Sequence, residues 1–261
     1  MTGVGGVIAV VLAQTVAGAA VLTWLTPLWH ETKRSYFTIH GTVVTFAFAL
    51  WAWMAARDGA ISGDVAGEWT VRLTLATLVV TAISTALLAF RQQVAGRAVG
   101  IVSVPVSIAA LIAFAATSRQ GLPLALFQVA AGAAFLGASF DGLFLGHWYL
   151  TDRKLTRTPI NRFTTVLIVA SCVEIVAIAT GGFSGTTASS SSFNPLLGPG
   201  ALAPWIAVGM AGATLLIAVL VRAALKGERA SAVQSATGFY YLGVVTAFTA
   251  EIAVKTRFFP G

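Results

Sequence analysis

The sequence predicts an all-α protein that crosses a membrane eight times. Hydrophobic residues make up 57% of the 261 residues and charged residues only 10%, and the mean hydropathy is +0.86. A hydrocarbon core of ~30 Å needs about 20 apolar residues of helix, and runs of that length follow one another with short connections. We therefore expect a bundle of eight transmembrane helices that forms one transmembrane domain over residues 1–261, without a separate soluble domain.

Each predicted helix is an apolar run between polar or helix-breaking residues. In chain order the runs cover 3–28, 37–56, 70–90, 97–117, 122–150, 160–182, 203–225 and 231–254. The first has no Lys or Arg before it, unlike a cleaved signal peptide, so we expect it to stay as a helix. The second ends at an acidic loop, and the third and fourth are joined by a short basic loop. Pro105 should kink the fourth, because proline removes a backbone donor.

The second four helices begin with the most informative one. Small residues recur every fourth position along the fifth helix, a pattern that lets another helix approach closely: Ala130, Ala134, Ala138, Gly142 and Gly146. The sixth helix carries the lone cysteine, Cys172, so no disulfide can form within the chain. The seventh follows a loop rich in Gly, Ser and Pro, including the serine run 189–192, which is typical of a flexible segment.

The distribution of Lys and Arg predicts the orientation. Eleven of the sixteen basic residues lie in or beside the odd-numbered loops: Lys33, Arg34, Arg91, Arg97, Arg153, Lys154, Arg157, Arg162, Arg222, Lys226 and Arg229. Cytoplasmic loops carry such an excess, so we expect both termini outside. The net charge of +7 then reflects this bias and attraction to anionic lipids, not a nucleic-acid-binding surface.

Carboxyl groups at membrane depth are the strongest functional indicators in this sequence. Asp141 lies in the fifth helix and Glu174 in the sixth, with Gln128 as a milder polar residue. Each buried carboxyl costs about 2.5–3.5 kcal/mol on insertion scales. Two interpretations stay open for each: an acid in a proton relay or quinone site, or a neutral carboxyl hydrogen-bonded to a neighbouring helix. A depth difference of roughly 12 Å, at ~1.5 Å rise per residue, argues against direct pairing of the two acids.

The last helix carries a second set of polar residues. Glu251 and Lys255 are four residues apart, so an ion pair between them is expected. Tyr240 shares their helix face and could line a polar pocket with them. The favoured interpretation is a structural ion pair at the outer membrane surface.

Three histidines, His30, His40 and His147, fall toward the predicted cytoplasmic face. Histidines at one depth could hold a quinone headgroup, and a b-type haem between two of them is the alternative. No spacing of His, Cys, Asp or Glu matches a metal-binding motif, and no covalently bound cofactor is expected.

The eight-span plan and the chain end resemble a known class of membrane subunit. Glu251, Lys255 and Arg257, followed by two phenylalanines, are similar to the end of membrane anchors of the polysulfide-reductase and DMSO-reductase type. The segment 145–150 is similar to uncharacterised bacterial eight-span proteins. The resemblance implies a helix-only subunit of a bacterial-type inner membrane that binds quinone and passes electrons to an iron–sulfur partner.

Three functions follow from these observations. The first is a subunit of a respiratory or electron-transfer complex, at most a non-catalytic or quinone-binding subunit of an oxidoreductase, in contact with lipid and with other subunits. In it, His147, Asp141 and His40 would surround a headgroup, and Tyr149 would donate a hydrogen bond. The second is a proton-coupled secondary transporter or channel that uses Asp141 and Glu174, which predicts two half-chains of similar fold. The third is a structural or assembly subunit.

Overall fold

The computed structural model describes residues 1–152, 154–181, 199–227 and 230–258. These residues form helices and turns, without a strand among them. Eight helical segments are long and apolar enough to cross a membrane, as predicted. The serine-rich loop, Arg153 and Arg229 lie outside the described residues.

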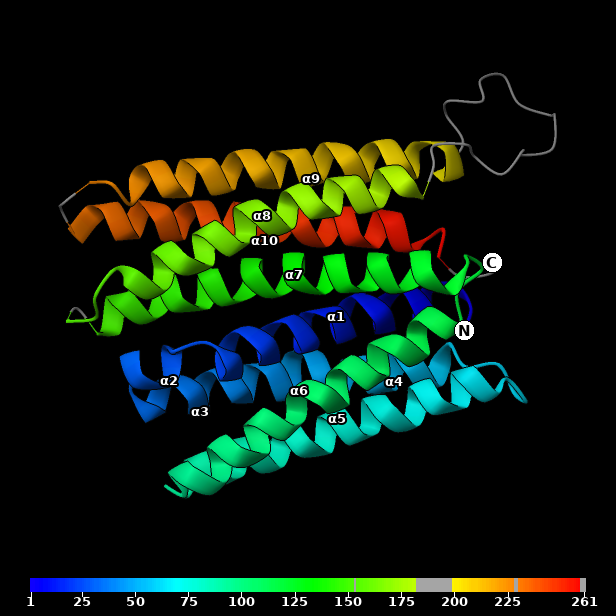
Figure 1. Ribbon diagram of the computed structural model, residues 1–261, viewed down its shortest axis with the longest axis horizontal. Coiled ribbons are helices and arrows are strands. Elements are labelled where there is room, and N and C mark those ends of the chain that lie inside the picture. Colours follow the sequence, from blue (N-terminus) through cyan, green and yellow to red (C-terminus); the bar gives the residue numbers. More distant parts are fainter. Residues whose placement is uncertain (153, 182–198, 228–229, 259–261) are drawn as a thin grey trace.

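The helices lie side by side in one bundle (Figure 1). Their bounds are α1 Gly3–Leu25, α2 Leu28–Glu31, α3 Arg34–Val43, η1 Val44–Ala49, α4 Leu50–Asp58, α5 Val65–Ala89, α6 Gln93–Ala116, α7 Leu122–Thr151, α8 Thr158–Thr180, α9 Pro199–Ala224 and α10 Ala230–Lys255. The second span is continuous from α3 through η1 to α4. Both termini lie at the same end of the bundle (Figure 1), which we call the terminal end; the other is the basic end.

Several spans differ from the predicted bounds: α5 begins at Val65 instead of residue 70, and α6 at Gln93 instead of residue 97. The first helix stops at Leu25 instead of residue 28, because Pro27 disfavours a helical conformation in the residue before it. The short helix α2 then leads into the second span, which starts three residues earlier than predicted. Within that span, η1 is π-helical: the backbone N–H of Leu50 donates to Thr45 O, five residues earlier. Pro105 is accommodated inside α6, on an exposed face of the helix.

The bundle consists of two four-span halves with the same arrangement of contacts. In the first half, α1 packs against α6 and the second span, and α5 packs along α6. In the second half, α7 packs against α10 and α8, and α9 packs along α10. α1 and α7 therefore occupy equivalent positions, and they run in the same direction through the bundle (Figure 1). The same pattern of contacts and direction is expected of a parallel repeat of two four-span units.

The two halves meet where α1 crosses α7. Gly18 and Gly137 bring the two backbones into contact: a Cβ on Gly18 would lie 1.9 Å from the carbonyl oxygen of Ala133. The predicted small-residue face of α7 divides between an open groove and a neighbouring helix. Ala130 and Ala134 are exposed toward a groove, whereas Gly142 and Gly146 accommodate Tyr240 and Thr237 of α10. Small residues thus pack α7 within the molecule on two sides.

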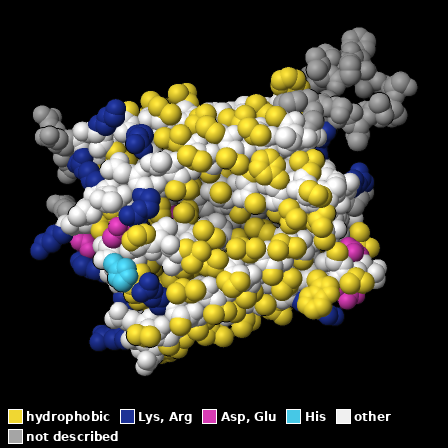
Figure 2. Space-filling model, viewed as in Figure 1, with side chains coloured by type: hydrophobic (Ala, Val, Ile, Leu, Met, Phe, Trp, Pro, Cys, Tyr) yellow, Lys and Arg dark blue, Asp and Glu magenta, His cyan; other side chains and the backbone are white. Residues whose placement is uncertain are grey.

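The surface carries a broad hydrophobic band with charged side chains gathered at its two ends (Figure 2). Lys and Arg are more numerous at the end opposite the termini in this view. The described basic residues of the odd-numbered loops thus share one end of the bundle, the distribution on which the predicted orientation rests.

Candidate functional site

Asp141 and His40 form a buried polar contact across the interface between the halves. His40 Nε2, on α3 of the first half, lies 2.7 Å from Asp141 Oδ1, on α7 of the second. Thr23 of α1 donates from its hydroxyl to Asp141 Oδ2 at 3.3 Å. The Asp141 side chain is completely buried and that of His40 nearly so. We call His40 and Asp141 the interface pair. Together with Thr23, the pair joins three helices inside the bundle.

Aromatic rings enclose the imidazole of His40. Tyr36, one turn earlier on α3, stacks on it with ring centroids 5.6 Å apart. Phe144 meets it edge-on at 5.0 Å, and Phe140 lies 5.5 Å away. The hydroxyl of Tyr36 is buried without a hydrogen-bond partner among the described residues. Because these rings shield one side of the imidazole from water, electrostatic interactions of the His40–Asp141 contact are stronger than they would be in water.

A small hydroxyl-lined cavity lies on another side of His40. Its volume is about 20 Å³, enough for one water molecule, which needs roughly 10–15 Å³. Its polar lining comprises His40 with Thr81, Ser84, Thr85 and Ser103. Buried hydroxyls continue from this cavity along one face of α5 toward the terminal end: Ser84, Thr81, Thr77, Thr74 and Thr70. We call these five residues the hydroxyl row.

The other predicted headgroup residues do not join the interface pair. His147 is exposed, and its Nε2 lies 2.7 Å from the hydroxyl of Tyr241. His30 is exposed on α2. Tyr149 donates to the carbonyl oxygen of Thr156, in the loop before α8. The structure therefore brings together Asp141 and His40 from the predicted group, and it separates both from His147, His30 and Tyr149.

The remaining predicted acids form a second cluster near the terminal end. Glu251 Oε2 and Lys255 Nζ are 3.2 Å apart, and both side chains are fully buried. The ion pair exists as predicted, but it lies inside the bundle instead of at the surface, because α7 and α8 cover it. Glu174 of α8 is also buried and lies beside both groups. Tyr240 does not belong to this cluster, since its hydroxyl lies 2.8 Å from Thr164 Oγ1 at the level of Gly142.

Two buried glutamines complete the second cluster. Gln14 of α1 donates from Nε2 to the carbonyl oxygen of Val129 at 3.1 Å. Gln128 of α7 donates from Nε2 to the carbonyl oxygen of Ala177 at 3.1 Å. Lys255 Nζ donates to the backbone oxygen of Gln128 at 3.3 Å. Gln128 and Asp141 are thirteen residues apart on α7, about 20 Å at ~1.5 Å per residue, so the two clusters lie at different depths.

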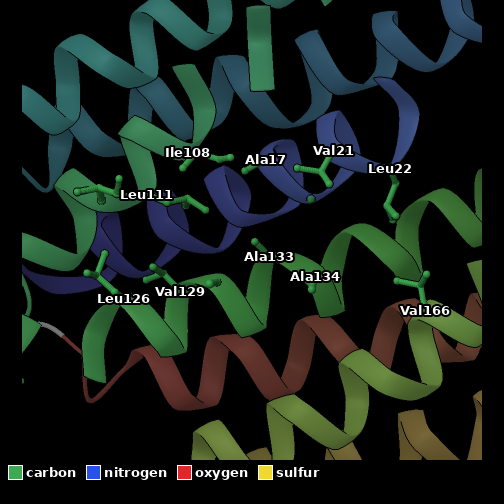
Figure 3. A pocket seen from close by; sticks show the side chains of 13 residues that line it. Ala17, Val21, Leu22, Ile108, Leu111, Leu126, Val129, Ala133, Ala134 and Val166 are labelled. Atoms are coloured by element: carbon green, nitrogen blue, oxygen red, sulfur yellow. The ribbon is translucent and has the colours of Figure 1, made fainter. Parts of the chain in front are cut away.

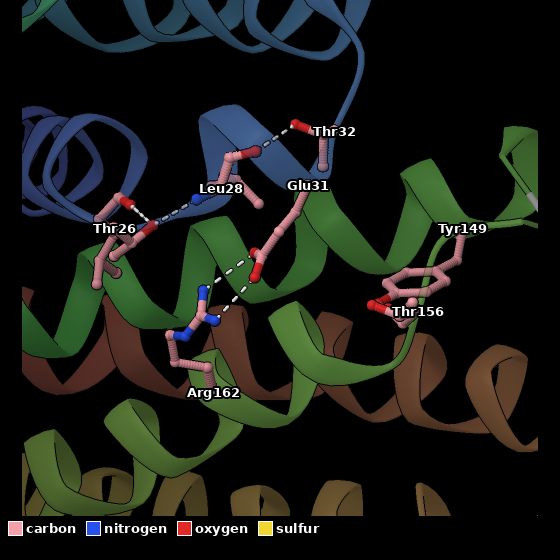
Figure 4. Close-up of polar contacts among 8 residues, drawn as sticks. Thr26, Leu28, Glu31, Thr32, Tyr149, Thr156 and Arg162 are labelled. Atoms are coloured by element: carbon pink, nitrogen blue, oxygen red, sulfur yellow. Dashed lines mark hydrogen bonds and ion pairs between the residues drawn. The ribbon is translucent and has the colours of Figure 1, made fainter.

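Ion pairs join the halves at the basic end. Arg162 of α8 donates from both terminal nitrogens to the carboxylate of Glu31 on α2, at 3.1 and 2.9 Å (Figure 4). Lys33 Nζ lies 2.8 Å from Asp152 Oδ2, just beyond α7. The hydrogen bond from Lys33 holds the pKa of the Asp152 carboxyl below its ordinary value.

An apolar groove lies between the halves, with a volume of about 470 Å³ (Figure 3). Side chains of α1, α6, α7 and α8 line it, among them Leu22, Leu111, Leu126 and Val166. Its lining side chains offer no hydrogen-bonding group. The groove therefore suits a hydrocarbon chain and not a polar headgroup.

A quinone headgroup does not fit at the interface pair in this structure. The space beside His40 is about 20 Å³, whereas sites for small organic ligands are roughly 300–1,000 Å³. The geometry does not favour a haem held by two of the histidines either. His40 Nε2 contacts Asp141, and the side chains of His30 and His147 are exposed.

Sequence reasoning missed Thr23, Tyr36, Gln14 and the hydroxyl row. One available signal was the spacing of the row, whose members recur every three or four residues through an otherwise apolar span. Comparisons with protein-family models, curated proteins and solved structures give no match to this chain. The functional conclusion must therefore come from the geometry of the two buried clusters.

Proposed function

We propose that this protein is a proton-coupled secondary transporter whose two halves rearrange around the Asp141–His40 contact. The observation that carries the proposal is a buried carboxylate–imidazole contact across the interface of two equivalent four-span halves. Parallel repeats with a functional site at their interface are a recurring design among secondary transporters. Ionisable groups buried in transmembrane segments are functional candidates by default, and proton relays use such residues.

The charge of the contact explains how a proton would control the halves. With one proton between them, Asp141 and His40 are neutral as a pair, whichever atom carries it. A second proton leaves a net positive charge, and loss of the proton leaves a net negative charge. Either charge is costly in a dry interior. A change in protonation therefore favours an arrangement of the halves in which water reaches the pair.

The hydroxyl row offers a route for that proton within the first half. Thr81 and Ser84 border the small cavity at His40. Thr74 and Thr77, together with Ser107 of α6, border a further cavity of about 10 Å³ closer to the terminal end. Each threonine of the row donates to a carbonyl of its own helix, so its oxygen can still accept a hydrogen bond from water.

The experiment measures the separation of the halves as a function of pH. In a Cys172→Ser background, pairs of spin labels at exposed positions would report each end: Phe90 with Leu150 at the basic end, and Ile61 with Leu122 at the terminal end. Between pH 5 and 8.5 we expect the two distance distributions to shift in opposite directions. Asp141→Asn, which cannot titrate, should abolish the shift. Distances that do not change with pH, or that change equally in the Asp141→Asn variant, would refute the proposal.

A transport assay on the same protein identifies the substrate. Proteoliposomes loaded with a pH-sensitive dye would be exposed to candidate solutes under an inward proton gradient. A solute whose addition changes the internal pH for the wild type, but not for Asp141→Asn, is a coupled substrate.

A quinone-interacting subunit of an electron-transfer complex is the second candidate. The apolar groove supports it, because its lining by aliphatic side chains suits an isoprenoid tail. Purification from native membranes in mild detergent, with partner identification and a visible absorption spectrum, separates the two candidates. Stoichiometric redox subunits would favour the complex, and a solitary colourless protein would favour the transporter.

A further inference from the structure

The apolar groove between the halves runs lengthwise along the bundle. In Figure 3 its lining side chains extend from Leu111 and Leu126 at one end to Leu22 and Val166 at the other. α1 ends and α8 begins at the basic end (Figure 1), so the groove reaches toward that end at Leu22 and Val166. Ala134 in its wall is exposed, so the groove opens onto the surface of the bundle between its two ends, where the hydrophobic band lies. The hydrocarbon chain of a lipid can therefore enter it from the side.

Two arginines lie beyond the basic end of the groove, one from each half. Arg162 precedes Val166 by one turn on the same face of α8, and it donates to Glu31 of α2 (Figure 4). Shortly before Glu31 on α2, Trp29 lies under the guanidinium of Arg97, whose Cζ is 5.3 Å from the ring centroid. Arg97 belongs to α6, which forms another wall of the groove. The short helix α2 thus contacts both arginines beside one end of the groove.

Arg97 is held in position without an acceptor for its charge. It lies about three turns from the groove residue Ile108, on the same face of α6. Its Nε is buried and has no hydrogen-bond partner, and no carboxylate among the described residues forms an ion pair with it. Trp24 contacts Gly100, where a Cβ would lie 2.4 Å from the Trp24 ring, and the ring centroids of Trp24 and Trp29 are 5.9 Å apart. This close packing fixes the position of the guanidinium before any ligand binds.

The chemistry of this end selects an anionic phospholipid as the occupant. The contact with Trp29 uses the face of the Arg97 guanidinium, so its N–H groups, which lie in the plane, can donate to an outside acceptor. The paired donors of a guanidinium match the geometry of a phosphate. A phosphodiester of net negative charge also neutralises Arg97, whereas a quinone headgroup is uncharged and a zwitterionic headgroup carries its own cation. Further donors are the exposed His30 of α2 and the N–H groups of Arg162 that Glu31 does not use.

We propose that the groove and this basic site bind one anionic phospholipid of the surrounding bilayer. An acyl chain occupies the groove between the halves, and the phosphate lies at Arg97 with His30 and Arg162 beside it. Basic pockets between transmembrane helices bind anionic headgroups in this way. Because the lipid contacts both halves, it stabilises their arrangement in this structure. The proposal does not depend on proton coupling at the interface pair, whose residues do not line the groove.

The test is native mass spectrometry of the purified full-length protein in mild detergent. The protein is titrated with phosphatidylglycerol, or with phosphatidylcholine that has the same acyl chains. We expect saturable binding of one phosphatidylglycerol per chain, with an apparent Kd about fivefold lower than that for phosphatidylcholine, the effect of one basic residue beside an anionic headgroup.

Substitutions at Arg97 test the headgroup contact. Arg97→Gln should raise the apparent Kd for phosphatidylglycerol to the value for phosphatidylcholine, whereas Arg97→Lys keeps the charge and should keep the preference. Arg57→Gln is the matched control, because the Arg57 guanidinium also lies over a tryptophan ring, 5.1 Å from the centroid of Trp53, but at the terminal end. It should bind both lipids as the wild type does.

A substitution in the groove tests the acyl-chain contact. Ala134→Phe places a ring in the groove and should weaken binding of both lipids, whereas Ala223→Phe on an exposed face of α9 should not. Equal affinity of the wild type for the two lipids would overturn the proposal. So would a preference that persists in Arg97→Gln, or unchanged binding by Ala134→Phe, in protein that elutes as the wild type does from a sizing column. A co-purified isoprenoid quinone that phosphatidylglycerol cannot displace would assign the groove to a quinone tail instead and would also overturn it.

Discussion

The crossing of α1 and α7 makes Gly18→Ala the sharpest structural perturbation of this protein. The new Cβ would lie 1.9 Å from the Ala133 carbonyl oxygen and 2.8 Å from Gly137 Cα, where ordinary contacts begin at 3.4 Å. The nearest obstacles are backbone atoms, so a rotamer change cannot relieve the overlap. The helices must separate by about 1.5 Å at the crossing, which removes dispersion contacts along the interface between the halves.

We expect Gly18→Ala to lower the free energy of unfolding by about 3 kcal/mol, the upper end of measured overpacking costs. Gly209→Ala in α9 is the matched control, since a Cβ there meets no atom within 4 Å. It should be neutral or stabilising by up to ~1 kcal/mol, because alanine favours helix over glycine. Both values can be measured by SDS titration of protein in mild detergent. A Gly18→Ala variant within about 1 kcal/mol of the control would refute the close crossing.

Three further predictions concern the charged groups. Asp141→Ala leaves His40 buried without its partner and should cost about 3–5 kcal/mol of unfolding free energy, whereas Asp141→Asn, which keeps shape and hydrogen bonding, should cost clearly less in the same SDS titration. Lys255→Met leaves two buried carboxyls without a cation, so its folded state must bind extra protons; its unfolding free energy should therefore rise as pH falls from 8 to 5, and a fall would contradict the buried cluster. Lys33→Met removes the donor that lowers the pKa of Asp152, so that pKa should return toward its ordinary value of 3.8 in carboxyl NMR titrations. A lowered folded-state pKa stabilises the protein at pH values above the unfolded-state pKa, and this small contribution is lost as the pH falls through the folded-state pKa. The variant should lack this contribution. An unchanged titration of Asp152 would contradict the contact.

The number and approximate position of the spans could be predicted from the sequence, because the hydrocarbon core of a membrane requires helices of a minimum length and an apolar composition. The largest error is at the start of α5, which begins at Val65 instead of residue 70 because Asp64 caps it and its first turn tolerates Glu68. The end of the first helix was misplaced by overlooking how Pro27 affects its neighbour. The local Glu251–Lys255 pair was also predictable, since four-residue spacing on one helix brings the two groups together whatever else packs there.

Contacts between helices could not be predicted in the same way. Span order does not specify spatial order, so the three histidines at one predicted depth gave no indication that only His40 faces α7. Burial of Glu251 and Lys255 depends on cover from α7 and α8, which their own helix does not encode. The two glutamines are unremarkable in the sequence, and their significance arises from the backbone carbonyls of Val129 and Ala177 that fix their orientation.

The even number of spans in each half has a consequence for how such a molecule can arise and be assembled. A four-span unit leaves the membrane on the side where it entered, so a second copy inserted after it takes the same orientation without any change in its topogenic charges. The short turn between Ala116 and Leu122 is the only backbone link between the halves, and each half contains its own set of helix contacts. Because the two halves belong to one chain, each can carry its own buried polar residues: histidine and a hydroxyl row in one, two carboxyls and a lysine in the other.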